Sequence, residues 1–170
     1  MFKKIIFIKI TLFFLLISFS NNLFAKKAAI IIDFDTQETL FEINADTLNF
    51  PASLTKVMTL YIVFDYLKRG EISWDTEMRV SKTAVSRSCS CLHIKEGDNI
   101  SVEDAIMALI IKSANNVATV ISEHISGSER NFAKLMTSYA RNIGMSKTTF
   151  KNASGLPNRA QLTTARDISI

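Results

Sequence analysis

The segment Ser53-Leu54-Thr55-Lys56 combines a weak nucleophile and a base at a spacing that lets the two meet. Residues three apart share one face of a helix, so the Lys56 amine can reach the Ser53 hydroxyl. A neighbouring base activates a serine by taking its proton, and apolar surroundings can lower the pKa of a lysine enough for this task. Val57 and Met58 would provide such surroundings. We take Ser53 as a candidate nucleophile and Lys56 as its candidate base, although the pattern alone is also typical of a helix start followed by a solvated lysine.

A second candidate, Ser113-Ala114-Asn115, lies 60 residues after Ser53, between two helical patterns. A loop there could present a hydroxyl and a carboxamide to a cleft. Serine and asparagine are equally common in ordinary turns between helices. The chemical interpretation of Ser113 and Asn115 therefore rests on their combination with the Ser53 segment.

Cys89 and Cys91 do not indicate a metal site. The pair lacks the second pair of ligands that a zinc site needs, and His93 and His124 are too far apart to complete one. A disulfide between residues two apart would close a small, strained ring. We interpret the two cysteines as small residues beside a strand and predict no metal.

The elements that must position these residues begin with a strand pair. Residues 28–34 and 39–43 are apolar runs rich in β-branched or aromatic residues, and the polar residues 35–38 between them indicate a turn. This pattern predicts an antiparallel hairpin. Two strands alone make a poor sheet, since about three strands or good helix packing are needed.

A helical pattern then runs from Phe50 through Leu67 and ends at Lys68-Arg69-Gly70, with basic residues followed by glycine. Short strand-like pieces follow at 77–80 and 92–94.

Three further helices are expected, over 105–111, 117–125 and from Ser128 to Gly144. Residues 101–104 form a capping box before the first of them, and the third keeps apolar residues at a spacing of 3.6. Residues 167–170 look like the start of another helix. A strand pair followed by a helix cluster indicates an α+β domain.

The first 25 residues read as a secretory signal peptide. Lys3 and Lys4 precede an apolar stretch over 10–19, and Ala25 offers a small residue for cleavage. The apolar run is short for a membrane span of about 20 residues and is interrupted by Lys9, although an uncleaved N-terminal anchor is an alternative. In either case we expect residues 26–170 to be exported, to the periplasm or outer face of a bacterium-like cell.

The net charge does not point to nucleic acid. The chain has 20 Lys+Arg against 16 Asp+Glu, a net charge of +4, but three of the lysines lie in the leader, which holds no acid. The remaining chain has 17 basic and 16 acidic residues, a net charge of +1. We therefore predict no nucleic-acid partner.

Four segments together resemble the serine-type D-alanyl-D-alanine carboxypeptidases, the low-molecular-mass penicillin-binding proteins. They are FPASLTKVMT (50–59), IKSANN (111–116), FKNASGLP (150–157) and TTARD (163–167). The resemblance runs from about Ala28 to Ile170, in the family's order and with similar spacing. It implies the α+β fold of β-lactamases and transpeptidases.

The resemblance also implies a role for each candidate. Ser53 resembles the acylated nucleophile, Lys56 its proton acceptor, Ser113 the group that relays a proton to the leaving D-alanine, and Asn115 a substrate-orienting amide. The implied substrate is a peptidoglycan stem peptide ending in D-Ala-D-Ala, which β-lactams mimic. The family needs no metal or organic cofactor, and its members often associate with the inner membrane through a further segment.

One departure is that this sequence contains no Lys-Thr-Gly, the family's third motif. We therefore interpret residues 26–170 as the N-terminal part of a carboxypeptidase domain and expect the chain alone to be inactive. A non-catalytic remnant or interaction fragment of a split gene is the alternative. A class A β-lactamase is less favoured, because it needs a downstream glutamate and residues 130–170 contain none.

Overall fold

The computed structural model describes residues 27–88 and 90–170. The predicted signal peptide and Cys89 lie outside the described residues. None of the helices that the structure describes is long and apolar enough to span a membrane.

The predicted N-terminal hairpin is confirmed. β1 (Ala29–Ile32) pairs antiparallel with β2 (Thr39–Ile43), with an irregularity in register between Ile31 and Ile32. The Asp33 carboxylate closes the turn by accepting hydrogen bonds from the backbone N–H of Asp35 and from that of Thr36. Every residue of β2 is exposed, so this hairpin contributes little to the core.

The helix predicted to start near Ser53 divides into two parts. A single 3₁₀ turn, η1 (Ala52–Leu54), leads directly into α2 (Thr55–Arg69). α2 ends at Gly70 in the left-handed conformation, as the sequence predicts.

A second two-stranded ladder forms further along the chain, where β3 (Glu77–Arg79) pairs antiparallel with β4 (Asn99–Ser101). α3 (Lys82–Val85) lies between these strands in the sequence. The prediction of a strand at 92–94 is wrong. The Asn116 side chain accepts a hydrogen bond from the Leu92 N–H and donates one to the Leu92 carbonyl, so neither group is free for a strand partner.

The remaining predicted helices are present, with small shifts. They are α4 (Val102–Lys112), α5 (Asn115–Ser126), α6 (Glu129–Asn142) and the short α7 (Ala165–Ile168). The side chains of Ser101 and Ser128 cap α4 and α6 by accepting a hydrogen bond from the backbone N–H three residues on. α5 starts two residues earlier than predicted, so Asn115 is its first residue.

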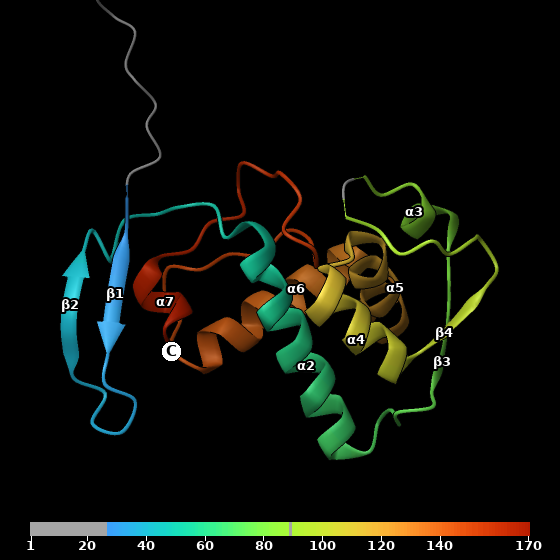
Figure 1. The fold of residues 1–170 in the computed structure, drawn as a ribbon, viewed down its shortest axis with the longest axis horizontal. Helices are drawn as coiled ribbons and strands as arrows, with labels where there is room; N and C mark the ends of the chain where they lie inside the picture. The colour runs from blue at the N-terminus through green and yellow to red at the C-terminus, as the bar shows by residue number, and fades with distance from the viewer. Residues whose placement is uncertain (1–26, 89) are drawn as a thin grey trace, which may run out of the picture.

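The core lies among the helices, with α5 at its centre. α5 is buried from Asn115 to Ser122 and contacts α2, α3, α4 and α6. Fully buried apolar side chains from α2, α5 and α6 meet there: Ile62, Val117, Val120, Ile121, Phe132 and Met136. Figure 1 shows the hairpin on one side of the helices and the β3–β4 ladder on the other. The predicted α+β class, a hairpin followed by a helical cluster, is confirmed.

Candidate active site

Ser53 lies in the middle of the η1 turn, and its side chain is exposed. The preceding residue, Ala52, has a φ of 46°, a left-handed conformation that a residue with a Cβ rarely adopts. Such strain persists only where the surrounding structure holds it, and it is found preferentially at functional sites. The turn therefore presents the Ser53 hydroxyl to solvent at the N-terminal end of α2.

The segment 150–157 supports this strained turn. Gly155 has a φ of +89°, and a Cβ at this position would lie 1.8 Å from the Ala52 carbonyl oxygen. Only glycine allows the two backbones to approach so closely. The Asn152 side chain fixes the glycine by accepting a hydrogen bond from the Gly155 N–H at 2.7 Å.

Lys56, one helical turn after Ser53, is buried, with 3% of its surface exposed. Its Nζ donates hydrogen bonds to Asn115 Oδ1 at 2.8 Å and to the Ser154 carbonyl at 2.6 Å. Burial lowers the pKa of Lys56, and a charged Cys91 thiolate would act in the opposite direction. No carboxylate pairs with Lys56 in the part of the chain that the structure describes.

Asn115 is anchored on its other side by the loop that follows α3. Its Nδ2 donates to the Ser88 carbonyl at 2.9 Å, and its backbone N–H donates to the Ser90 carbonyl at 2.7 Å. Ser113, two residues earlier, caps α4 in the left-handed conformation with a φ of 54° and is half-buried. The strained Ser113 turn and the anchored Asn115 side chain thus join α4 to α5.

The structure brings Lys56 and Asn115 into direct contact, across 59 residues of sequence. The hydrogen bond expected between Ser53 and Lys56 is absent, and among the described residues the Ser113 hydroxyl makes no hydrogen bond to Lys56 either. The Lys56 N–H groups instead point to Asn115 and Ser154. A lysine nitrogen has four tetrahedral positions, so two donated bonds and the bond to Cε leave one position open.

Sequence reasoning missed part of this environment. Ser154 takes part through its backbone carbonyl, and Ala153 likewise accepts a hydrogen bond from the Thr59 hydroxyl at 2.8 Å. Side-chain patterns carry no information about which carbonyls face a buried amine. The only signal was that segment 150–157 resembles a family motif.

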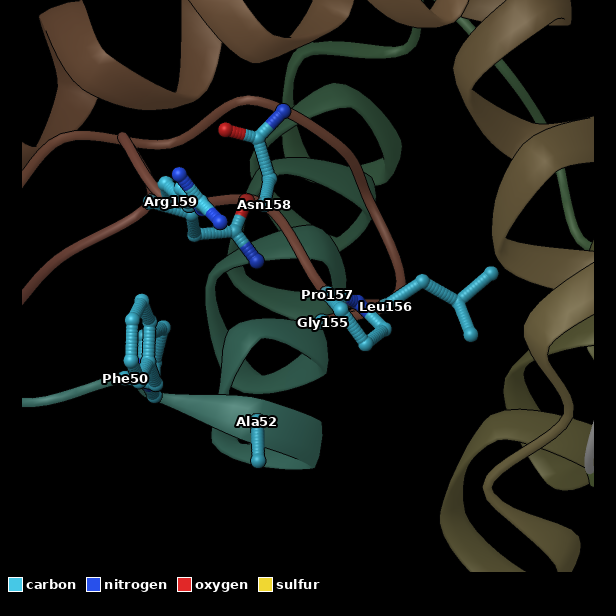
Figure 2. Close-up of a pocket in the computed structure, with 9 residues that line it drawn as sticks. Phe50, Ala52, Gly155, Leu156, Pro157, Asn158 and Arg159 are labelled. Carbon is cyan, nitrogen blue, oxygen red and sulfur yellow. The ribbon is translucent and has the colours of Figure 1, made fainter. Parts of the chain in front are cut away.

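A cavity of about 470 Å³ opens beside the Ser53 turn. Figure 2 shows Phe50 and Ala52 on one side of it and the 155–159 segment on the other. The cavity is lined by Phe50, Pro51, Ala52, Gly155, Leu156, Pro157, Asn158, Arg159 and Gln161. Its surface is largely apolar, with a few polar groups, as is usual for sites that bind small molecules or peptides.

A serine and a buried lysine at the head of α2, and an asparagine that starts α5 and contacts the lysine, define the class of penicillin-interacting serine enzymes. Comparison with known proteins specifies the class further. Residues 18–170 match the S11 peptidase family, described as D-alanyl-D-alanine carboxypeptidase, and the chain belongs to this family.

Curated relatives include D-alanyl-D-alanine carboxypeptidase DacC of Escherichia coli, 36% identical over 150 residues, which cover 85% of this chain and 38% of the relative. DacF of Bacillus subtilis is 31% identical over 169 residues, which cover 92% of this chain and 43% of the relative. The chain thus spans about two fifths of the length of these relatives.

Solved structures confirm the penicillin-binding fold. D-alanyl-D-alanine carboxypeptidase DacD of Francisella tularensis superposes with a TM-score of 0.82 at 37% identity, covering 88% of this chain and 36% of that one. Penicillin-binding protein D2 of Listeria monocytogenes, in its ampicillin-bound form, gives a TM-score of 0.75 at 31% identity, covering 88% and 60%.

Proposed function

We propose that this chain carries the nucleophile, the base and the substrate-orienting amide of a serine-type D-Ala-D-Ala carboxypeptidase. The substrate is a peptidoglycan stem peptide that ends in D-Ala-D-Ala. The observation that supports this most directly is the buried Lys56 amine, held by two hydrogen bonds from Nζ and without a counter-charge among the described residues.

A neutral lysine amine has two N–H donors and one lone pair. With both donors directed at Asn115 and Ser154, the lone pair occupies the remaining tetrahedral position. The lowered pKa of Lys56 favours this neutral form. Lys56 can then take the proton of Ser53 as its oxygen attacks the carbonyl carbon of the penultimate D-alanine.

The attack forms a tetrahedral intermediate, which collapses with cleavage of the peptide bond. The leaving D-alanine takes a proton, relayed through Ser113, and Asn115 orients the peptide amide. Water then hydrolyses the Ser53 ester and restores the serine. A β-lactam would acylate Ser53 in the same way by opening of its ring, and its acyl group would remain on the serine.

The substrate also determines the compartment. Peptidoglycan lies outside the cytoplasmic membrane, so the proposal requires residues 26–170 to be exported, with residues 1–25 as the signal peptide. The mature protein would then act in the periplasm or in association with the inner membrane. As the domain assignment, we propose that residues 26–170 form the N-terminal part of the peptidase domain.

The test is covalent labelling by a fluorescent penicillin. Residues 27–170 are joined to the C-terminal part of E. coli DacC, which supplies the remainder of a relative. We expect a labelled band that Ser53→Ala removes. Ser73→Ala, which changes an exposed serine beyond the opposite end of α2, is the control and should leave the label intact. Labelling that persists in Ser53→Ala would refute the assignment, and absence of label in a folded hybrid would favour the non-catalytic alternative.

A further inference from the structure

Glu129, in the first turn of α6, belongs to none of the motifs above, yet its side chain is largely buried, with 14% exposed. Its carboxylate forms an ion pair with Arg87. One of its oxygens, Oε1, accepts a hydrogen bond from the Ala153 N–H at 3.2 Å and lies 3.5 Å from the Thr119 hydroxyl. Arg87 closes the cluster by donating from Nε to Thr119 at 3.0 Å.

Each partner of Glu129 stands next to a group that holds the Lys56–Asn115 pair. Ala153 precedes Ser154, whose carbonyl accepts from Lys56. Arg87 precedes Ser88, whose carbonyl accepts from Asn115 Nδ2. Thr119 lies one helical turn after Asn115 and contacts its carbonyl at 3.4 Å. One carboxylate thus joins the three segments from which the surroundings of Lys56 are built.

We propose that Glu129 is a positioning residue for Lys56: paired with Arg87, its carboxylate holds the Ala153–Ser154 backbone so that the Ser154 carbonyl faces the Lys56 amine. The inference rests on the proposed function in assigning Lys56 as the base. Glu129 itself contacts neither Lys56 nor Ser53 in the structure, so it acts through the backbone of segment 152–155.

The cluster is suited to this task because its opposite charges are paired and only partly exposed, 27% for Arg87 and 14% for Glu129. Removing one member of a partly buried ion pair leaves the other charge without its partner, where water compensates only in part, and this is unfavourable. Segment 152–155 also has a second attachment, from the Thr59 hydroxyl to the Ala153 carbonyl. Loss of Glu129 should therefore loosen the segment and admit water to Lys56 without unfolding α2.

The experiment measures the pKa of Lys56 by NMR in the full 170-residue chain in mild detergent, with ¹³C-labelled lysine. The Lys56 signal is assigned with Lys56→Arg. All proteins carry Cys91→Ser, because Cys91 is the titratable group whose charge acts on Lys56. Glu129→Gln should raise the pKa of Lys56 toward its ordinary value, since hydration removes the cause of the depression. Glu129→Asp retains the charge but shortens the reach and should shift the pKa in the same direction.

Asp46→Asn is the matched control, because Asp46 also pairs with arginine and lysine but lies exposed. It should leave the pKa of Lys56 unchanged.

If Glu129→Gln lowers the melting temperature but leaves the pKa of Lys56 unchanged, the role of Glu129 is merely structural and the proposal fails. If Glu129→Gln does not fold, an unchanged pKa in folded Glu129→Asp overturns it equally. Neither readout depends on penicillin labelling, so failure of the proposed function would be seen separately.

Discussion

At Lys56, two physical effects act in opposite directions on the charge of the amine. Burial disfavours the ammonium form because the charge loses its water, while a negative charge on the Cys91 thiolate would favour it. A carboxylate beside the amine would stabilise the charge and remove its use as a base. The absence of an ion pair at Lys56 among the described residues therefore agrees with its proposed role as a base.

From the lowered pKa of Lys56 we predict how the free energy of unfolding depends on pH. The unfolded chain, where the lysine has its ordinary pKa of 10.5, binds more protons than the folded chain between the two pKa values. The free energy of unfolding should therefore rise with pH from the folded pKa of Lys56 up to about 10.5. Urea denaturation of the wild type and of Lys56→Met at several pH values from 7 to 10 measures this dependence.

Lys56→Met is informative because methionine has similar length and no charge. The free energy of unfolding of the wild type relative to that of Lys56→Met should increase with pH in this range. Only the wild type has a lysine at position 56 that releases its proton on folding. A constant offset from the lost hydrogen bonds does not affect the slope. Parallel curves for the two proteins would contradict a lowered pKa of Lys56.

The sequence indicates which residues form the candidate site, but it does not indicate their contacts. Ser53, Lys56, Ser113 and Asn115 stand in short local patterns, and local spacing is visible in a sequence. The link between Lys56 and Ser154 joins positions 98 apart through a backbone carbonyl. Nothing in the side chain of Ser154 indicates this contact, so only the folded chain reveals it.

At the level of elements, the helices were easier to predict than the strands. The sequences of α2, α4 and α6 contain periodic apolar residues and residues typical of helix ends. These signals are local, because each involves residues only a few positions apart. β4 has three residues and pairs with β3 across about twenty positions, so local pattern says little about it. The wrong prediction of a strand at 92–94 illustrates the same limit. The backbone N–H and carbonyl of Leu92 are hydrogen-bonded to the side chain of Asn116, which is distant in the sequence.

The packing of segment 150–157 on η1 gives a prediction at this scale. Gly155→Ala would place a Cβ against the Ala52 carbonyl in a conformation that already disfavours a side chain. The position of the added Cβ is fixed by the backbone of residue 155, and the atom it meets is a backbone oxygen. No rotamer change can therefore relieve the clash. We expect a loss of about 3 kcal/mol or more in the free energy of unfolding, from overpacking and left-handed strain together.

Gly127→Ala is the matched control. Gly127 also has a positive φ, of +69°, but a Cβ there would meet nothing within 4 Å. Its cost should be limited to the left-handed strain, about 1–2 kcal/mol. Urea denaturation of the two variants compares them directly. Equal losses would show that the close approach of Gly155 to Ala52 does not support the turn.

Over the whole molecule, the helical cluster and the hairpin differ in how well they are buried. Figure 1 shows the hairpin at the side of the molecule, beside the helices. The helices surround the apolar core, while the hairpin exposes apolar side chains. Exposed residues in this region include Ile31, Phe34, Leu40, Phe41 and Ile43. Exposed apolar surface of this kind normally marks a region of further contact. Ser53, the proposed nucleophile, lies in the turn that leads into α2, on the helical part of the molecule.

We predict that the 170-residue chain alone reacts poorly with penicillin even though it contains Ser53 and Lys56, the proposed nucleophile and base. The family resemblance implies a Lys-Thr-Gly strand that forms one wall of the cleft and supplies part of the oxyanion site, and these 170 residues contain no such motif. Loss of one oxyanion donor lowers a rate by about 10²–10³-fold. Labelling of the chain by a fluorescent penicillin should therefore be at least about 100-fold slower than labelling of the hybrid with the C-terminal part of DacC.

The chain and the hybrid are compared on one gel over a time course, each beside its Ser53→Ala variant. Ser53-dependent labelling of the chain at the rate of the hybrid would show that the helical part alone stabilises the developing oxyanion, and the prediction would be wrong.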